Sequence, residues 1–447
     1  MKFLHLSDLH IGKNVNGYSM IAEQKHAFRQ IFGYIRAEHP AVVIIAGDIY
    51  DRAVPGVEAV RVFDDFLTEL STMNVSVLII SGNHDSAERL SYASRLLSEK
   101  RLFFRGVFDA GYGDGGDDAG DTVGDDGGAD GRDTEHDSAG DSAGDSAGYS
   151  AGDSECDTLH NTAGDTVRSN AGPIKRITLS DEHGNVHFHL LPFIKPSSLR
   201  GLTPEFDCET CHDAVSAAIS AADIDYSERN VLISHQFYTK EGVTPVRSES
   251  ELTPVGGLDA VDAGVIERFD YAALGHLHGW QTVGVGHILY CGSPVKYSFS
   301  EWRHEKSVAL VELGAKGILS VKRLPLSPIH DMREIKGELG TLISDAVSSL
   351  ADTEDYLRVI LTDEEEIIDP MGKLRSVYPN VMSLGFENSR TRVDAGAVIT
   401  DAETVGALSP YDLFCEFFLE SQGSVMSPEQ TAVARRLLET GDEDTAD

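Results

Sequence analysis

Aspartate, histidine and asparagine residues recur in this chain directly after short apolar runs. They occur in Asp8-Leu9-His10, Gly47-Asp48-Ile49-Tyr50-Asp51, Gly82-Asn83-His84-Asp85, Ser234-His235 and Gly275-His276-Leu277-His278. Carboxylate and amide oxygens combined with imidazole nitrogens suit divalent transition ions such as Mn²⁺, Fe²⁺ or Zn²⁺. Because no cysteine belongs to the set, the pattern does not predict a structural zinc site with thiolate ligands.

Each of these motifs follows a run that is predicted to be a β-strand. The runs are residues 2–6, 41–46, 75–80, 230–233 and 271–274. In an open α/β sheet, ligands gather at the edge where the parallel strands end. We therefore expect the motifs to converge on one metal site. A single motif of this kind also fits a turn or a helix cap, so the prediction depends on their repetition in the same strand–loop context.

The alternation of strands and helices indicates the fold class. Helical patterns at 19–38, 57–70 and 91–98 alternate with the first three strands, as in crossover units of a parallel sheet. Strand patterns predominate again from 173 to 325, where 287–290 and 307–313 are expected to complete a second sheet. Two sheets packed between helices predict an α/β fold, a four-layer αββα sandwich.

The pattern changes after Pro325 and Pro328, which mark a domain boundary. Residues 326–390 are predicted to form a small α+β capping domain, with one helix at 338–350. Residues 391–447 contain a linker and two amphipathic helices. The first of these helices carries an apolar stripe made of Leu413, Phe414, Phe417 and Phe418. The stripe either packs on its own domain or docks a partner helix, since helix-in-groove recognition uses this spacing.

The formal net charge of −36 disfavours nucleic-acid binding, because phosphate contacts normally need Lys and Arg. Much of the excess lies in residues 109–172, which are rich in Asp, Gly, Ser and Ala and are expected to be a disordered acidic insertion within domain 1–325. We interpret it as a tolerated loop extension rather than a DNA-repelling tether, because closing a longer loop adds little entropy cost. A partner subunit can supply the positive surface that the chain lacks.

Cysteine usage and hydropathy indicate the cellular compartment in which the protein is expected. Five cysteines in 447 residues do not form a disulfide framework. Cys208, Cys211 and His212 match the pattern of haem attachment, but we interpret them as the start of an Ala-rich helix. No apolar run approaches the roughly 20 residues that span a bilayer, and the first residues do not read as a signal peptide. We expect a cytoplasmic protein with no membrane partner.

In this order, the motifs resemble those of the calcineurin-like metallophosphoesterases. Residues 1–12, 291–299 and 409–414 further resemble the nuclease subunits of bacterial SbcC–SbcD complexes, and the resemblance covers nearly the whole chain outside 109–172. It implies a two-metal-dependent DNA nuclease, with Mn²⁺ as the expected ion. Such an enzyme acts as a double-strand exonuclease and a single-strand or hairpin endonuclease in DNA end processing, recombination and repair.

The resemblance also implies a role for each site residue. One ion is expected on Asp8, His10, Asp48 and His278, and the other on Asp48, Asn83, His235 and His276, so that Asp48 bridges them. His84 is expected to stabilise the transition state or to protonate the leaving oxygen. Asp51 is expected to orient and charge His84, although archaeal relatives have a histidine near that position. Asp85 is expected to support the site or cap a helix.

Partners follow from the same resemblance. The C-terminal helices are expected to clasp an SbcC-like coiled-coil ATPase, and a homodimer through residues 57–70 and 91–98 is expected within a heterotetramer. The substrate would be double-stranded DNA ends and hairpins. Candidate DNA contacts are Asn14, Asn16, Arg52, Arg89, Lys296 and Tyr297. For each of them, an ordinary solvated side chain is an equally good explanation.

Two other functions fit some of the features. A small-molecule phosphodiesterase or nucleotidase would use the same dinuclear site, but it would need neither the capping domain nor the apolar C-terminal stripe. A non-enzymatic DNA tether is disfavoured because every ligand position is filled.

Overall fold

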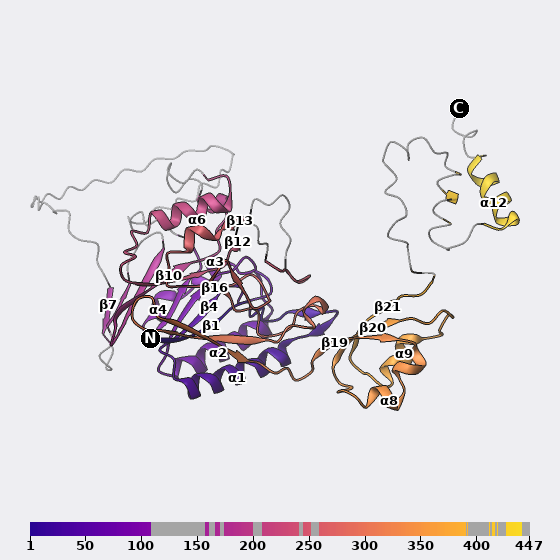
Figure 1. Ribbon diagram of the computed structural model, residues 1–447, viewed down its shortest axis with the longest axis horizontal. Coiled ribbons are helices and arrows are strands. Elements are labelled where there is room, and N and C mark those ends of the chain that lie inside the picture. The colour runs from indigo at the N-terminus through magenta and orange to yellow at the C-terminus, as the bar shows by residue number, and fades with distance from the viewer. Residues whose placement is uncertain are drawn as a thin grey trace, which may run out of the picture.

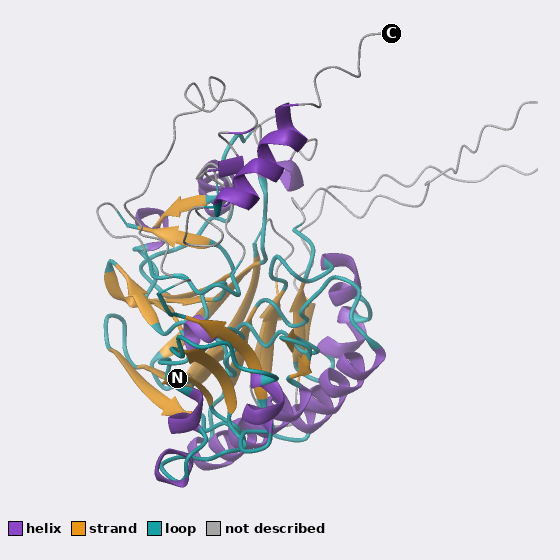
Figure 2. Cartoon of the chain, turned by 90° about the vertical axis from the view of Figure 1, so that its right-hand side faces the viewer, coloured by secondary structure: helices purple, strands orange, loops and turns teal. Residues whose placement is uncertain are grey.

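The computed structural model describes most of the chain and shows two β-sheets packed face to face between helices (Figures 1 and 2). The described residues are 1–108, 157–160, 166–169, 174–199, 208–240, 245–251, 259–389, 391, 411, 414–415, 418 and 426–439. Within this part of the chain, no helix is both long enough and apolar enough to cross a membrane.

The first sheet has six strands in the order β18-β17-β1-β4-β5-β6. Their bounds are β1 Lys2–Leu6, β4 Val42–Ala46, β5 Ser76–Ile80, β6 Leu102–Arg105, β17 Ser307–Leu313 and β18 Leu319–Pro325. Strands β1, β4, β5 and β6 run parallel, so their carboxyl ends lie along the same edge. Every residue of β4 and β5 is buried, as expected for parallel strands covered on both faces.

The second sheet has eight strands in the order β15-β16-β14-β11-β10-β9-β8-β7. Their bounds are β7 Asp157–His160, β8 Thr166–Ser169, β9 Lys175–Asp181, β10 Gly184–Leu191, β11 Arg229–Ser234, β14 Tyr271–Leu274, β15 Gln281–Val283 and β16 Val285–Tyr290. Strands β10, β11, β14 and β16 run parallel. This sheet therefore also brings several carboxyl ends to one edge.

Two expectations about the sheets were wrong. Strand β17 pairs antiparallel with β1 in the first sheet, not with the second sheet, because an apolar strand pattern indicates burial but not the neighbouring strand. Strands β7 and β8 form an antiparallel pair within the segment expected to be disordered. Composition dominated that prediction and hid two short β-prone runs, Thr158-Leu159 and Thr166-Val167. Residues 109–156 lie outside the described part of the chain.

The helices cover the outer faces of the two sheets and confirm the αββα sandwich. Helices α1 (Ile21–Glu38) and α2 (Val57–Ser71) cover the first sheet, and their Phe28 and Phe66 rings lie 4.4 Å apart between centroids. Helix α6 (Cys211–Ser220) covers the second sheet. The inner faces share an apolar layer in which Phe3 packs edge-on against Phe188, with ring centroids 5.6 Å apart.

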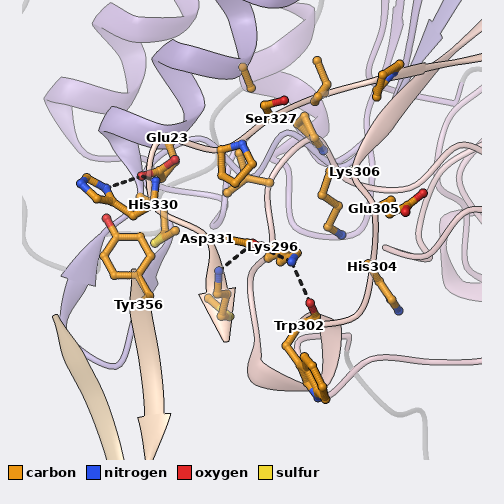
Figure 3. Close-up of a pocket in the computed structure, with 18 of the residues that line it drawn as sticks. Glu23, Lys296, Trp302, His304, Glu305, Lys306, Ser327, His330, Asp331 and Tyr356 are labelled. Atoms are coloured by element: carbon orange, nitrogen blue, oxygen red, sulfur yellow. Dashed lines mark hydrogen bonds and ion pairs between the residues drawn. The ribbon is translucent and has the colours of Figure 1, made fainter. Parts of the chain in front are cut away.

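A smaller parallel sheet follows, in the order β19-β20-β21. Its elements are β19 Met332–Gly337, α7 Leu339–Leu342, α8 Asp345–Ser348, β20 Tyr356–Leu361, α9 Pro370–Arg375 and β21 Val381–Phe386. The single helix expected at 338–350 is instead two short helices, because Ser344 is the extended residue that precedes α8. Ion pairs of Glu23 with His330 at 2.9 Å and of Lys296 with Asp331 at 2.7 Å connect the segment before β19 to the sandwich (Figure 3).

The remaining described elements are short or lie near the C-terminus. They are β2 Asn14–Val15, β3 Tyr18–Ser19, α3 Ala87–Ser91, α4 Ser94–Ser98, α5 Pro196–Leu199, β12 Phe237–Thr239, β13 Ala260–Asp262 and α12 Pro428–Glu439. The helix expected at 91–98 is interrupted at Ala93, whose φ of 58° is left-handed. In the apolar stripe, the Phe414 and Phe418 ring centroids lie 6.5 Å apart, whereas Leu413 and Phe417 lie outside the described residues.

Candidate metal centre

The loops that follow β1, β4, β5, β11 and β14 meet at one edge of the sandwich. The backbone N–H of Asp8 donates to Gly47 O at 3.1 Å, and that of His10 donates to Asp48 O at 2.9 Å. The second sheet joins them through the backbone N–H of His276, which donates to the Asp8 carboxylate at 3.0 Å. The seven residues expected to bind metal are therefore brought together from both sheets.

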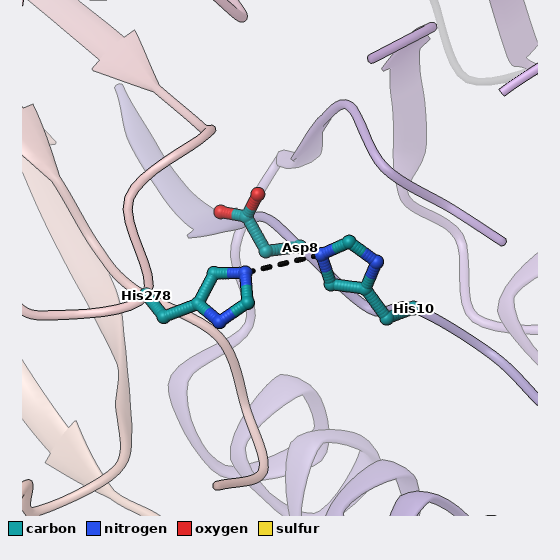
Figure 4. Close-up of side chains that lie close together, drawn as sticks. All are labelled: Asp8, His10 and His278. Atoms are coloured by element: carbon teal, nitrogen blue, oxygen red, sulfur yellow. Dashed lines mark hydrogen bonds between the residues drawn. The ribbon is translucent and has the colours of Figure 1, made fainter. Parts of the chain in front are cut away.

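One group of possible ligands consists of Asp8, His10 and His278 (Figure 4). Asp8 and His10 come from one loop, whereas His278 is distant in the sequence. One ligand atom from each lies within 4.8 Å of the others. The Nε2 atoms of His10 and His278 are 3.1 Å apart, and all three side chains are buried. This arrangement presents two imidazole nitrogens and a carboxylate to a common point.

A second group lies beside the first and includes Asp8, Asp48 and His235. The Nε2 of His235 is 3.3 Å from Asp48 Oδ2 and 3.1 Å from Asn83 Oδ1. The Nδ1 of His276 is also 3.1 Å from Asn83 Oδ1. Asp48 Oδ2 is also 3.5 Å from His10 Nε2, so the Asp48 carboxylate approaches histidines of both groups.

The charges of these groups suit a cation. Burial lowers the pKa of His10 well below its usual value and, with the nearby His235, lowers the pKa of His276 to about 3. Burial would also lower the pKa of His235, but the Asp48 and Asp8 carboxylates outweigh it and raise that pKa to about 9. Neutral imidazoles have the lone pairs that metal ions need, and buried carboxylates need positive charge nearby. The donor set therefore fits divalent metal ions.

The backbone at the ligand positions is strained. Asp8, His10 and Asp48 have φ values of 54°, 42° and 50°, in the left-handed region that non-glycine residues rarely adopt. Such a conformation costs about 1–3 kcal/mol per residue and tends to occur at functional sites. Hydrogen bonds between the loops maintain it, and the side chains consequently point inward.

Glycines in the motifs allow these loops to approach closely. A Cβ atom on Gly82 would lie 2.1 Å from Asp48 Oδ1, and one on Gly275 would lie 1.9 Å from Ala46 O. Neither position has room for a larger residue. The recurrent glycine before an Asp, Asn or His is thus explained by the packing of one ligand loop on another.

His278 is held by residues that the sequence patterns did not single out. Its Nδ1 lies 2.8 Å from Ser250 Oγ and 3.2 Å from Glu301 Oε1, and its backbone N–H donates to Glu251 at 2.7 Å. Since Nδ1 faces a carboxylate, it carries the hydrogen, and the Nε2 lone pair is directed at the metal groups. None of these supporting residues follows a predicted parallel strand, so sequence reasoning had no signal for them.

Glu301 is itself held by Lys306, whose Nζ lies 2.6 Å from Glu301 Oε2 and also donates to His278 O at 2.9 Å. Burial would raise the pKa of Glu301, but Lys306 and His278 outweigh it and hold that pKa well below its usual value. On its other side, Lys306 lines a cavity of about 350 Å³ between the sandwich and β19 (Figure 3). Lys306 therefore connects the lining of this cavity to the residues that hold His278.

His84 lies beside the ligand groups, but Asp51 contacts it in an unexpected way. The Nδ1 of His84 is 2.8 Å from the backbone oxygen of Asp51, and its backbone N–H donates to Asp48 Oδ1 at 2.9 Å. The Asp51 carboxylate instead binds Lys13 at 2.7 Å. The expectation that this carboxylate orients His84 is therefore wrong, because the main-chain oxygen of Asp51 orients the ring. Its expected effect on the charge of His84 stays a prediction.

Asp85 supports the loops rather than capping a helix. Its carboxylate accepts hydrogen bonds from the backbone N–H groups of Gly82, Ile49 and Tyr50 at 2.9, 3.1 and 3.0 Å. The side chain that caps α3 is Ser86. Asp85 thus fixes the loop of Asn83 against the loop of Asp48.

The candidate DNA contacts divide into two groups. Asn14, Asn16, Arg52 and Arg89 have exposed side chains. Lys296 instead binds Trp302 O and Asp331 at 2.7 Å each, and the Tyr297 side chain is only 3% exposed and donates its hydroxyl to Leu9 O. The expectation of DNA contact is therefore wrong for these two residues, because each is committed to an internal partner.

Two family models, one curated relative and one solved structure match parts of this chain. Residues 1–146 match the family model described as calcineurin-like phosphoesterase, and residues 328–422 match the SbcD_C model, described as Type 5 capsule protein repressor C-terminal domain. The chain is 27% identical over 387 residues to the SbcD subunit of the SbcCD nuclease of Staphylococcus epidermidis, covering 86% of this chain and 85% of that protein. A dimetal phosphatase from Danio rerio aligns over 73% of this chain and 96% of its own, with 13% identity and a TM-score of 0.37.

The fold and the first family match identify a calcineurin-like phosphoesterase domain over residues 1–146, which indicates a phosphodiester hydrolase, and the buried groups described above form its candidate metal site. The C-terminal match and the curated relative place it more narrowly. Over most of its length it is similar to the SbcD subunit of the SbcCD nuclease.

Proposed function

We propose that this protein is the DNA nuclease subunit of an SbcC–SbcD-type complex. It would cut double-stranded ends as an exonuclease and single strands or hairpins as an endonuclease, in DNA end processing, recombination and repair. The observation that carries the proposal is the Asp48 carboxylate, which lies within 3.5 Å of buried histidines from both groups of possible ligands. The curated relative is named as a nuclease, which supports a nucleic acid as the substrate.

We assign two Mn²⁺ ions to this centre. One would be held by Asp8, His10, Asp48 and His278, and the other by Asp48, Asn83, His235 and His276. When bound, paired divalent ions neutralise phosphate oxygens and lower the pKa of a water molecule to generate the nucleophile. The protein contributes the fixed directions of its donor atoms, which the strained loops and the contacts of His278 maintain.

His84 would handle the proton of the leaving group. Its Nδ1 hydrogen is bound to the carbonyl of Asp51, so Nε2 is the atom that exchanges a proton. In the imidazolium form, Nε2–H donates to the leaving oxygen as the bond to phosphorus breaks. Exposed Asn16, Arg52 and Arg89 would contact the DNA backbone further from the cut.

Each part of the chain would have its own function. Residues 1–325 would form the nuclease domain, 326–390 the capping domain, and 391–447 the linker and partner-binding helices. A coiled-coil ATPase like SbcC would dock on the apolar stripe of Leu413, Phe414, Phe417 and Phe418. A homodimer within a heterotetramer, acting in the cytoplasm, completes the proposal.

The test is Mn²⁺-dependent cleavage of a labelled hairpin-ended duplex, measured beside hydrolysis of bis-p-nitrophenyl phosphate. Wild type and His84→Ala are compared with and without the ATPase partner. We expect wild type to cut the DNA and the variant to lose that activity. Hydrolysis of the small diester alone, even with the partner present, would instead identify a small-molecule phosphodiesterase.

A further inference from the structure

The loop of residues 245–251 is anchored firmly to the metal centre. Ser250 and Glu251 hold His278 from two sides, as described above. At the other end of the loop, the Gln281 side chain accepts from Val246 N at 2.9 Å and donates to Val246 O at 2.8 Å. The residue after Val246 therefore has a fixed backbone beside the site.

That residue is Arg247, whose guanidinium stacks on a ring that neighbours His276, one of the residues expected to hold the second ion. The Cζ atom is 3.6 Å from the centroid of the Phe237 ring, on which the guanidinium stacks. The Phe237 ring in turn lies 6.2 Å from that of His276, between centroids. Stacking positions the guanidinium by its face and leaves the N–H groups at its edge free to bind a ligand.

Arg247 has no acidic partner among the described residues, although the chain contains 73 Asp and Glu residues against 37 Lys and Arg. Neither an ion pair nor a hydrogen bond joins its guanidinium to any of the acidic residues in that part of the chain. A half-buried cation beside a metal centre needs an anion, and a guanidinium matches the oxygens of a phosphate in geometry.

We propose that Arg247 binds a non-bridging oxygen of the phosphodiester held at the metal centre. The inference rests on the proposed function, because it assumes that the metal centre binds phosphodiesters. It adds a substrate-binding residue supplied by a loop that also supports a metal ligand, so that the substrate contact and the metal geometry are fixed together. The phosphate would lie between the metal groups and the Phe237 ring.

The chain offers a matched control in Arg268. Its guanidinium also stacks on an aromatic ring, with Cζ 3.8 Å from the centroid of Tyr226. Arg268 precedes β14, however, whereas His276 follows it, so the two arginines lie at opposite ends of this strand. Arg268→Ala removes the same kind of stacked cation away from the site.

The test uses the full chain loaded with Mn²⁺ and measures binding of inorganic phosphate by calorimetry, together with KM and kcat for the labelled duplex. For Arg247→Ala we expect phosphate binding to weaken on the order of tenfold or more, as for loss of a charged hydrogen bond. The KM for DNA should rise similarly. The slope of log KM against log salt concentration should fall by about 1, the amount expected for one lost phosphate contact. Arg247→Lys should restore part of the binding, and Arg268→Ala should behave as wild type.

Wild-type phosphate binding in Arg247→Ala would overturn the inference, and so would weakening that accompanies loss of Mn²⁺, because the effect would then be structural. Failure of the proposed function looks different. In that case the wild-type protein itself would not cleave DNA, while phosphate binding would still report on Arg247.

Discussion

His84 Nδ1 lies 2.8 Å from the backbone carbonyl oxygen of Asp51, whereas the Asp51 carboxylate is bound to Lys13. A carbonyl oxygen only accepts hydrogen bonds, so Nδ1 keeps its hydrogen in both the neutral and the charged ring. The ring is thereby oriented by the main chain, and the identity of the side chain at position 51 matters little to it.

Replacing His84 and replacing Asp51 should therefore have unequal effects. We expect His84→Ala to lower kcat by about 10²- to 10⁴-fold, the usual contribution of a general acid. Asp51→Asn keeps the carbonyl and loses mainly the pair with Lys13, so kcat should fall less than about tenfold. Steady-state kinetics on the labelled duplex measures both. Equal losses in the two variants would show that the carboxylate acts on His84 after all.

A methyl group at position 82 should weaken metal binding and lower the rate by displacing the Asp48 loop. In Gly82→Ala, the new Cβ would lie 2.4 Å from Asp48 N and must displace the Asp48 loop. A displacement of about 1 Å typically costs roughly 10²-fold in rate, and Mn²⁺ binding by calorimetry should weaken as well.

Gly33→Ala is the matched control for that variant. Gly33 lies within α1, and an added methyl group would have no neighbouring atom within 4 Å, so this change should stabilise the fold by about 0.5–1 kcal/mol. Its Mn²⁺ binding should remain at the wild-type value. Unchanged Mn²⁺ binding in Gly82→Ala would contradict the packing of one ligand loop on the other.

Glu301 should control metal affinity although it is not a proposed ligand. Glu301→Gln removes the charge that faces His278 Nδ1 and Lys306. Loss of such a contact to a ligating histidine usually weakens metal binding about 10- to 100-fold. Mn²⁺ titration followed by electron paramagnetic resonance measures the change. Glu305→Gln, an exposed position on the same loop, should bind Mn²⁺ like wild type; a similar loss there would count against a specific role for Glu301.

The pH dependence of stability should depend partly on His189, which is buried and bonded to Asn230 at 2.8 Å. Burial lowers its pKa from 6.5 to about 4, so between these values the unfolded chain binds more protons than the folded one. The contribution of neutral, buried His189 to the free energy of unfolding is complete above pH 6.5. It is lost as the pH falls toward 4, by about 3 kcal/mol in total.

Urea unfolding of wild type and His189→Gln at several pH values tests this prediction. The difference between the two proteins cancels the pH dependence of the metal site, which both share. The wild-type free energy of unfolding should fall more steeply between pH 6.5 and 4 than that of the variant. Parallel curves would show that His189 does not titrate as its burial implies.

The sequence was sufficient for the architecture of the site but not for its supporting contacts. The convergence of candidate ligands such as Asp48 and His235 was predictable because the end of a parallel strand has a known place in the sheet. DNA contact was wrongly expected of Lys296 and Tyr297 because they follow the site motif of His276 and His278 closely in sequence. Their actual partners, Asp331 and Leu9, are not part of that motif. Arg247 was missed because its loop has neither periodicity nor a motif.

The distinction between side chain and main chain was also beyond the sequence. An aspartate at position 51 suggests a carboxylate role, yet its carbonyl makes the contact with His84. Likewise, the apolar pattern of β17 predicted a buried strand, and only the register of Leu310 opposite Leu4 shows that it extends the first sheet. Both outcomes are decided by tertiary packing rather than by local preference.

The most direct test of the central claim is anomalous X-ray diffraction at the manganese edge from crystals of the full chain soaked in Mn²⁺. We predict two anomalous peaks per chain, both within ligand distance of the Asp48 carboxylate, one beside His10 and His278 and the other beside His235 and His276. A single peak, or peaks that the Asp48 carboxylate does not bridge, would contradict the two-ion centre.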